Sequence, residues 1–193
     1  MEFTYAEGAT PLDPDEAHDL IPTHITTSDQ LNEWEQANIL QGETWLFQRK
    51  RPELLREPFL RELHRKMFDL TWRWAGQYRK TAKNIGVPFS QIGARIKDAC
   101  DNAAFQVANE VFDLDETAVR LHHNLVSIHP FPNGNGRHTR LVADALLFQN
   151  DRERFSWGSA NLQIAGDARA TYLSALRSAD KGDYAGLIRF ARG

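Results

Sequence analysis

The chain has 193 residues, a formal net charge of −3 and a single cysteine, Cys100. One compact domain with a short appended arm fills this length, because two full domains would each have too little core. The slight acidity argues against direct nucleic-acid binding, which needs a basic surface. One cysteine excludes an intrachain disulfide and a cluster of thiolate metal ligands.

The sequence is typical of a cytoplasmic protein without a membrane span. Its N-terminus is acidic and lacks the apolar core of a secretory signal. Even the apolar stretch of residues 141–148 contains Asp144 and is shorter than the roughly 18 residues that a membrane span needs. The single cysteine fits a reducing cytosol.

Proline marks the first segment of the chain. Residues 1–27 contain Pro11, Pro14 and Pro22 among acidic and small residues, a composition that favours extended chain and turns. We therefore predict an N-terminal extended arm over residues 1–27. It would lie on the surface of a helical domain that comprises residues 28–193.

Helical spacing of apolar residues begins after Thr27 and Ser28, either of which can cap the first helix. In that helix Gly42 is a candidate bend. A second amphipathic helix follows Pro58, and Asp113 with Glu116 resembles the capping box of another. Helical spacing recurs in stretches that contain Ile96, Leu146, Leu173 and Leu187.

Residues 76–88 interrupt the helical pattern. Gly76, Gly86 and Pro88 break a helix, while Tyr78 and Ile85 are residue types that suit a short strand. A loop or a short hairpin is therefore expected here. The predicted fold class is all-α, a helical bundle with one short β-like excursion.

The candidate site is the loop of residues 129–140, His-Pro-Phe-Pro-Asn-Gly-Asn-Gly-Arg-His-Thr-Arg, which opens onto the most apolar helix. A helix N-terminus presents unpaired N–H groups and a partial positive charge, and Gly134 and Gly136 let the backbone approach an anion closely. Arg137 and Arg140 lie on neighbouring positions of the first turn, where a cation is unfavourable unless an anion binds. The loop is therefore predicted to hold the phosphates of a nucleotide.

His129 lies at the opposite end of this loop. An imidazole with a pKa near neutrality can take a proton from a hydroxyl nucleophile. A base and a phosphate cradle in one loop predict transfer of a phosphorus-centred group to a hydroxyl. The alternative is a structural turn, because Pro-Asn-Gly-Asn-Gly is a good turn sequence and a single histidine is usually structural. The order of the whole run favours function.

This loop resembles the signature of the Fic family, His-x-Phe-x-Asp/Glu-Gly-Asn-Gly-Arg-x-x-Arg, and matches it at every fixed position except Asn133. The resemblance includes the Trp-x-Trp-Ala-Gly-Gln-Tyr-Arg run of residues 72–79 and continues to the Gly-Asp-Tyr of residues 182–184. Residues 10–14, 21–27 and 32–39 are similar to a bacterial Fic subgroup called mobile mystery protein B. That subgroup is associated with mobile elements and with a companion helix-turn-helix protein.

The resemblance implies a Fic-type helical bundle and a protein adenylyltransferase. Such an enzyme moves AMP from ATP to a Tyr, Thr or Ser hydroxyl of a target protein and releases pyrophosphate. His129 would be the general base, Phe131 would anchor the loop in the core, and Arg137 would act at the distal phosphates. The implied nucleotide-binding residues are Gly134, Asn135, Gly136, Arg137 and Arg140, with Asn135 near the α-phosphate and Arg140 supporting the loop or the phosphates.

The resemblance also implies a target-docking flap and a metal site. The flap would be a short β-hairpin that docks the target as an extended strand, formed by Lys83, Asn84, Ile85, Gly86 and Val87. Asn133 stands where the family usually has an acidic residue that holds Mg²⁺. An amide oxygen can ligate Mg²⁺, but one formal charge is lost, so weak metal binding, a different nucleotide product or reduced activity are open alternatives.

Many Fic proteins carry an inhibitory helix, Ser/Thr-x-x-x-Glu-Gly/Asn, whose glutamate pairs with the signature arginine. No segment of this chain matches that motif strictly. Glu33 and Glu35 lie ahead of Asn38 in the corresponding region, and Glu35 is the candidate for reaching Arg137. The alternative interpretation of both glutamates is a solvated helix charge.

Two other functions compete with adenylyl transfer. The same fold could transfer a phosphoryl group or another nucleotide, because the loop contacts phosphates rather than bases. A third hypothesis is a catalytically lapsed interaction module, in which Asn133 marks the lost activity and the protein serves its regulator.

Overall fold

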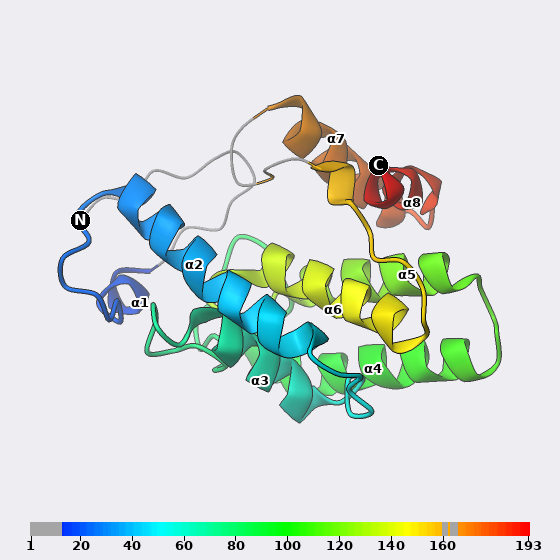
Figure 1. Cartoon of the computed structure of the whole chain (residues 1–193), viewed down its shortest axis with the longest axis horizontal. Coiled ribbons are helices and arrows are strands. Elements are labelled where there is room, and N and C mark those ends of the chain that lie inside the picture. Colours follow the sequence, from blue (N-terminus) through cyan, green and yellow to red (C-terminus); the bar gives the residue numbers. More distant parts are fainter. Residues whose placement is uncertain (1–12, 160–161, 163–165) are drawn as a thin grey trace.

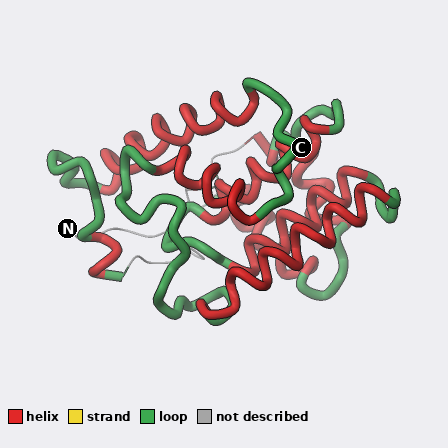
Figure 2. The backbone as a smooth tube through the Cα atoms, turned by 90° about the horizontal axis from the view of Figure 1, so that it is seen from below, coloured by secondary structure: helices red, strands yellow, loops and turns green. Residues whose placement is uncertain are grey.

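The computed structural model describes residues 13–159, 162 and 166–193, and these form a helical bundle without a strand (Figures 1 and 2). The all-α prediction is therefore confirmed for this part of the chain. The helices are α1 (Pro14–Ala17), α2 (Ser28–Phe47), α3 (Glu57–Phe68), α4 (Ile92–Ala108), α5 (Leu114–Ile128), α6 (Asn135–Gln149), α7 (Asp167–Ala179) and α8 (Ala185–Arg192), with 3₁₀ turns η1 (Phe89–Gln91) and η2 (Trp157–Ser159).

Helix α6 is the centre of the bundle, as its apolar sequence predicted. It packs against α5, α3 and α2 (Figure 1). Residues on several of its faces are buried, among them Val142, Ala143, Leu146 and Leu147. Burial on all sides fixes the N-terminus of α6 relative to its neighbours, so the preceding loop has a rigid base.

The start of α2 follows the sequence prediction closely. Thr27 is the N-cap, its hydroxyl accepts a hydrogen bond from Gln30 N at 3.3 Å, and the Gln30 side chain accepts one from Thr27 N. The predicted bend at Gly42 is wrong, because α2 runs unbroken through it. A Cβ at Gly42 would lie 2.9 Å from Met67 Cγ, so this glycine instead lets α2 lie close to α3.

The start of α5 confirms only half of the predicted capping box. Asp113 is the N-cap and accepts a hydrogen bond from Asp115 N at 3.2 Å. Glu116 does not reach back to the cap and instead pairs with Arg120 one turn along the helix.

The described part of the N-terminal arm, residues 13–27, contains the single turn α1 and then lies along the segment after α3. Leu20 and Trp72 form an isolated antiparallel bridge, and Ile21 N donates to Thr71 O at 2.9 Å. Residues 1–12 of the predicted arm are outside the described residues. The arm thus contributes backbone pairing as well as surface cover.

The segment of residues 80–88 is a loop, and the β-hairpin expected there is not formed. The physical reason is that its main-chain groups have other partners. Arg79 donates from its guanidinium to Thr81 O and Val87 O, and Val87 N donates to Ile128 O at 3.3 Å. These bonds tie the loop to the end of α5 rather than to itself.

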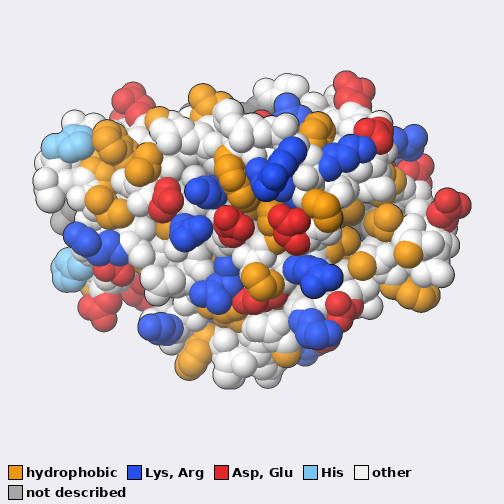
Figure 3. Space-filling view, turned by 60° about the horizontal axis from the view of Figure 1, so that its bottom comes forward, with side chains coloured by type: hydrophobic (Ala, Val, Ile, Leu, Met, Phe, Trp, Pro, Cys, Tyr) orange, Lys and Arg blue, Asp and Glu red, His pale blue; other side chains and the backbone are white. Residues whose placement is uncertain are grey.

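Figure 3 shows one face of the molecule, on which acidic and basic side chains are interspersed rather than gathered by sign. Among the described residues, no helix is long and apolar enough to cross a membrane.

Candidate active site

The Asn135 side chain bridges the loop between α5 and α6. Asn135, the first residue of α6, accepts a hydrogen bond from Phe131 N at 2.9 Å and donates to Phe131 O at 2.8 Å. The Phe131 ring is buried and stacks on His64, with 3.7 Å between ring centroids. The expectation that Phe131 anchors the loop in the core is confirmed.

The first turn of α6 offers main-chain N–H groups to an anion. Gly134, Asn135 and Gly136 begin the helix, where N–H groups lack intrahelical acceptors. Beside Gly136 an added Cβ would meet only Arg140 Nη1, at 3.6 Å, so the backbone is open on that side. The amide side chain of Asn135 is occupied by Phe131, which leaves its backbone N–H as the group available to a phosphate.

Gly134 is required by both conformation and space. Its φ is +77°, in the left-handed region, and an added Cβ would overlap the Phe68 ring. Its N–H donates to Asn133 Oδ1 at 2.5 Å. The tight turn into α6 therefore depends on the absence of a side chain.

His129 ends α5 in a left-handed conformation, with φ 53° and ψ 62°. The side chain is buried, and neither ring nitrogen has a hydrogen-bond partner among the described residues. Burial, and then the positive charges of Arg79 and Lys83, lower the pKa of His129 to about 4. The imidazole is therefore neutral at pH 7 and has an acceptor nitrogen for a proton.

The opposite side of the loop carries the ion pair between Arg137 and Glu35. Arg137 Nη1 lies 2.7 Å from Glu35 Oε2, and Trp72 Nε1 donates to Glu35 Oε1 at 2.6 Å. Glu35 is only 3% exposed, although it is a charged residue on α2. Glu33, the other candidate glutamate on α2, is exposed. The structure thus brings Glu35, and not Glu33, to the signature arginine.

Arg140 lies beneath the loop. The central carbon of its guanidinium lies 5.7 Å from the centroid of the Tyr172 ring. Burial lowers the pKa of Arg140, and Tyr172 OH lies 3.0 Å from His122 Nε2. Tyr172 belongs to α7, so these contacts join Arg140 to α7, and both roles expected for Arg140 stay predictions.

Asn133 does not form a protein-built magnesium site. Its side-chain oxygen already accepts the Gly134 N–H, and its main-chain O contacts His64 Nε2 at 3.1 Å. Within the described chain, no group of three or more His, Cys, Asp or Glu side chains could hold a metal. One neutral amide oxygen fits Mg²⁺ only as an accessory to ligands that a nucleotide would bring.

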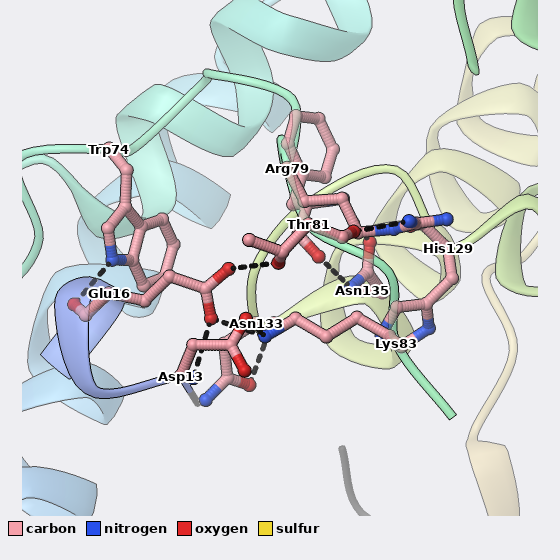
Figure 4. Close-up of polar contacts among 11 residues, drawn as sticks. Asp13, Glu16, Trp74, Arg79, Thr81, Lys83, His129, Asn133 and Asn135 are labelled. Carbon is pink, nitrogen blue, oxygen red and sulfur yellow. Dashed lines mark hydrogen bonds and ion pairs between the residues drawn. The ribbon is translucent and has the colours of Figure 1, made fainter. Parts of the chain in front are cut away.

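The flap residues divide into two groups, of which Figure 4 shows Lys83 with its acidic partners Asp13 and Glu16. The Lys83 side chain is 3% exposed and pairs with Asp13, at 2.9 Å, and with Glu16. Glu16 also accepts a hydrogen bond from Thr81 Oγ1 at 3.2 Å, so the arm is attached to the base of the flap. Asn84, Ile85 and Gly86 are exposed, and they can contact a target where Lys83 cannot.

The sequence analysis missed two parts of this site. Arg79 entered it only as one letter of a resembling run, yet it is buried against His129 and donates to His129 O at 2.6 Å. Asp13 and Glu16 were assigned to an extended surface arm, without a contact to the site. A signal for Arg79 was present in its position directly after Tyr78 in an apolar and aromatic run, where a charged residue needs a specific partner.

Comparisons with known proteins agree with this geometry. Residues 54–147 match the Fic/DOC family. A probable protein adenylyltransferase of Aquifex aeolicus is 32% identical over 84 residues, which cover 44% of this chain and 23% of that protein. A protein adenylyltransferase Fic of Nematostella vectensis is 30% identical over 119 residues, which cover 60% of this chain and 26% of that protein.

The matched stretches thus span about a quarter of these relatives. Among solved structures, the BepC protein of Bartonella tribocorum with bound AMPPNP has a TM-score of 0.70 at 17% identity. The similarity covers 93% of this chain and 97% of that one. At this identity the comparison shows a shared fold.

Proposed function

Because residues 54–147 form a Fic/DOC family domain, we propose that this chain is a protein adenylyltransferase. It would transfer AMP from ATP to a Tyr, Thr or Ser hydroxyl of a target protein. The observation that carries the proposal is His129, a neutral buried imidazole without a hydrogen-bond partner among the described residues, one loop away from the N-terminus of α6. That pairing of a base with an anion site suits an in-line attack on a phosphate.

In the proposed reaction, His129 accepts the proton of the target hydroxyl as its oxygen forms a bond to the α-phosphorus. The bond between the α-phosphorus and the β-bridging oxygen breaks, and pyrophosphate leaves. The N–H groups of Asn135 and Gly136 stabilise the charge that develops on the α-phosphate oxygens. Arg137 binds the distal phosphates after it is released from Glu35.

The resting enzyme is proposed to be inhibited by Glu35. This carboxylate pairs with the Arg137 guanidinium that the distal phosphates need. Glu35 lies on the buried side of α2, which keeps the carboxylate in place. Trp72 holds the second carboxylate oxygen, so the glutamate is fixed in the pairing geometry. ATP would then bind productively only when α2 or the Glu35 side chain moves.

The target would dock on the exposed part of the flap. The target would pair as an extended segment with Asn84, Ile85, Gly86 and Val87. Such backbone hydrogen bonding selects an extended conformation of the target and depends less on its side chains. Lys83 would act indirectly, because its ammonium is held by Asp13 and Glu16. A β-hairpin at this flap would form only when a target segment supplies the partner strand.

Mg²⁺ bound with the nucleotide would neutralise phosphate charge, with Asn133 as the accessory protein ligand. The similarity of the N-terminal segments to mobile mystery protein B further suggests a cytoplasmic bacterial protein with a helix-turn-helix companion.

Label transfer tests this function. Wild type, His129→Ala and the exposed-histidine control His18→Ala are incubated with Mg²⁺ and either α- or γ-labelled ATP, alone and in host lysate. Each is also prepared with Glu35→Gly, so that inhibition does not hide transfer. With α-labelled ATP we expect a labelled protein band in the Glu35→Gly samples that keep His129, including the His18→Ala control, and none in the samples with His129→Ala.

Other outcomes would reassign the site. Transfer of γ-label alone would establish a phosphotransferase. Silence of both labels, with Glu35→Gly present, would refute catalysis and favour the lapsed module, for which Asn133 is the specific sequence observation.

A further inference from the structure

Arg79 connects three parts of the site through main-chain carbonyl groups. Within the described chain, its guanidinium makes four hydrogen bonds, and every acceptor is a carbonyl oxygen. The acceptors are Ile128 O and His129 O at the end of α5, and Thr81 O and Val87 O at the two ends of the flap. Its main-chain N–H also donates to Pro130 O at 2.9 Å.

These bonds act on the residue with the least relaxed backbone of the site. His129 has φ 53° and ψ 62°, a left-handed conformation that costs a non-glycine residue about 1 kcal/mol or more unless the surroundings enforce it. Arg79 binds the carbonyls of residues 128 and 129 and the carbonyl of residue 130, so it fixes both peptide groups that flank His129. The direction of the His129 Cα–Cβ bond, from which the imidazole extends, follows from that backbone.

Gly86 brings the flap onto the same group. An added Cβ at Gly86 would lie 2.7 Å from Arg79 Nη2 and 2.8 Å from His129 Cβ. The flap backbone at Gly86 therefore lies against both the guanidinium and the catalytic histidine, and a displacement of the flap would disturb the Arg79 bond to Val87 O. Arg79 is 3% exposed, so water does not replace the bonds easily.

The charges that face His129 come from two segments. Arg79 lies on the segment after α3 and Lys83 on the flap, and both charges lower the pKa of His129. Lys83 is itself paired with Asp13 and Glu16 of the arm, whereas the Arg79 guanidinium bonds only neutral carbonyls within the described residues. Arg79 is accordingly the larger of the two electrostatic contributions.

We propose that Arg79 is a positioning residue that holds His129 in its catalytic conformation and couples that conformation to the flap on which the target docks. The inference rests on the proposed function for its kinetic consequence, while the conformational part concerns the chain itself. A fork of five N–H donors suits this role, because lysine cannot reach carbonyls on opposite sides at once.

The test compares Arg79→Lys and Arg79→Gln with Arg51→Gln. Arg51 is a matched control, since it is 5% exposed and donates to the carbonyls of Trp45 and Leu46 at the far end of α2. Four properties are measured in each protein: thermal unfolding, ATP affinity by calorimetry, His129 backbone and imidazole chemical shifts against pH, and steady-state AMP transfer.

We expect both Arg79 variants to lose about tenfold to a hundredfold in kcat, because a small misplacement of a reacting group has this effect. KM for ATP should stay within about twofold, since the phosphate site on α6 is untouched. Arg79→Gln should also raise the pH at which the His129 imidazole titrates, because a positive charge beside it is removed. Arg79→Lys keeps a positive charge, so its imidazole should titrate at a lower pH than that of Arg79→Gln. In both, the His129 backbone shifts should move away from left-handed values.

Unchanged His129 shifts and midpoint in Arg79→Gln would overturn the proposal, as would an equal loss of kcat in Arg51→Gln. Failure of both Arg79 variants to fold would overturn it too, because Arg79 would then be a residue on which the whole fold depends. The chemical shifts test the conformation of His129 even if wild type transfers no AMP. Failure of the positioning role is therefore distinguished from failure of the proposed adenylyl transfer.

Discussion

Replacement of Glu35 by glycine should open the phosphate site. In the structure the Glu35 carboxylate pairs with Arg137 at 2.7 Å, and the two side chains are 4% and 15% exposed. A hydrogen bond to a charged group at a shielded site contributes about 1.5–3 kcal/mol. A nucleotide that needs Arg137 must first break this pair, so its apparent affinity is reduced by that free energy.

Converted at about 1.4 kcal/mol per factor of ten, this free energy corresponds to a roughly 10- to 150-fold gain in ATP affinity for Glu35→Gly. The AMP-transfer rate at low ATP should rise with it. Glu35→Gln should give a smaller gain, because an amide can still accept from Trp72 Nε1 and loses only the charge.

Isothermal titration with ATP measures the affinity directly. Glu33→Gly is the matched control, since Glu33 is exposed on the same helix and its replacement carries the same helix penalty of about 1 kcal/mol. An unchanged or weaker ATP affinity in Glu35→Gly, or an equal gain in Glu33→Gly, would refute the inhibitory role and leave Glu35 as a structural partner of Trp72.

Three further predictions concern the loop and the core. With the pKa of His129 lowered to about 4, AMP transfer should stay constant from pH 8 to about pH 5 and decline below that as the imidazole is protonated; a decline centred near pH 6.5 would contradict this assignment. Gly134→Ala should lower the free energy of unfolding in urea by about 1–3 kcal/mol, because of its positive φ and the overlap of the new Cβ with the Phe68 ring of α3. Gly136→Ala should change that free energy by less than about 1 kcal/mol, because alanine has the higher helix propensity and its Cβ meets only Arg140 Nη1. Burial raises the pKa of Asp144 to about 7, so the folded state binds this proton more tightly than the unfolded chain does, and the associated stability is present at low pH and lost as the pH rises to 7. From pH 5 to pH 8 the free energy of unfolding of wild type should therefore fall by roughly 1–3 kcal/mol relative to that of Asp144→Asn. If urea unfolding gives the same difference between the two proteins at every pH, the prediction is wrong.

Local patterns in the sequence were enough to predict the helices and the loop. Helix caps and apolar spacing act within a few residues, which is why the start of α2 was predicted at Thr27 or Ser28, of which Thr27 is the N-cap. The proposed anion site likewise uses residues adjacent in the sequence, because Gly134, Asn135 and Gly136 lie together at the start of α6. The departure at Asn133 was also visible in the sequence alone.

Contacts between distant segments were decided only by the tertiary structure. Glu35 and Arg137 are 102 positions apart. The sequence named Glu35 as the candidate partner, but only the packing of α2 against α6 decided that the two side chains meet. Arg79 and His129 are 50 positions apart, and the carbonyl bonds of Arg79 replace the hairpin that the glycine-rich segment suggested. The physical reason is the same for both: a buried charge takes whatever partner the packed helices bring to it, and sequence spacing does not encode that approach.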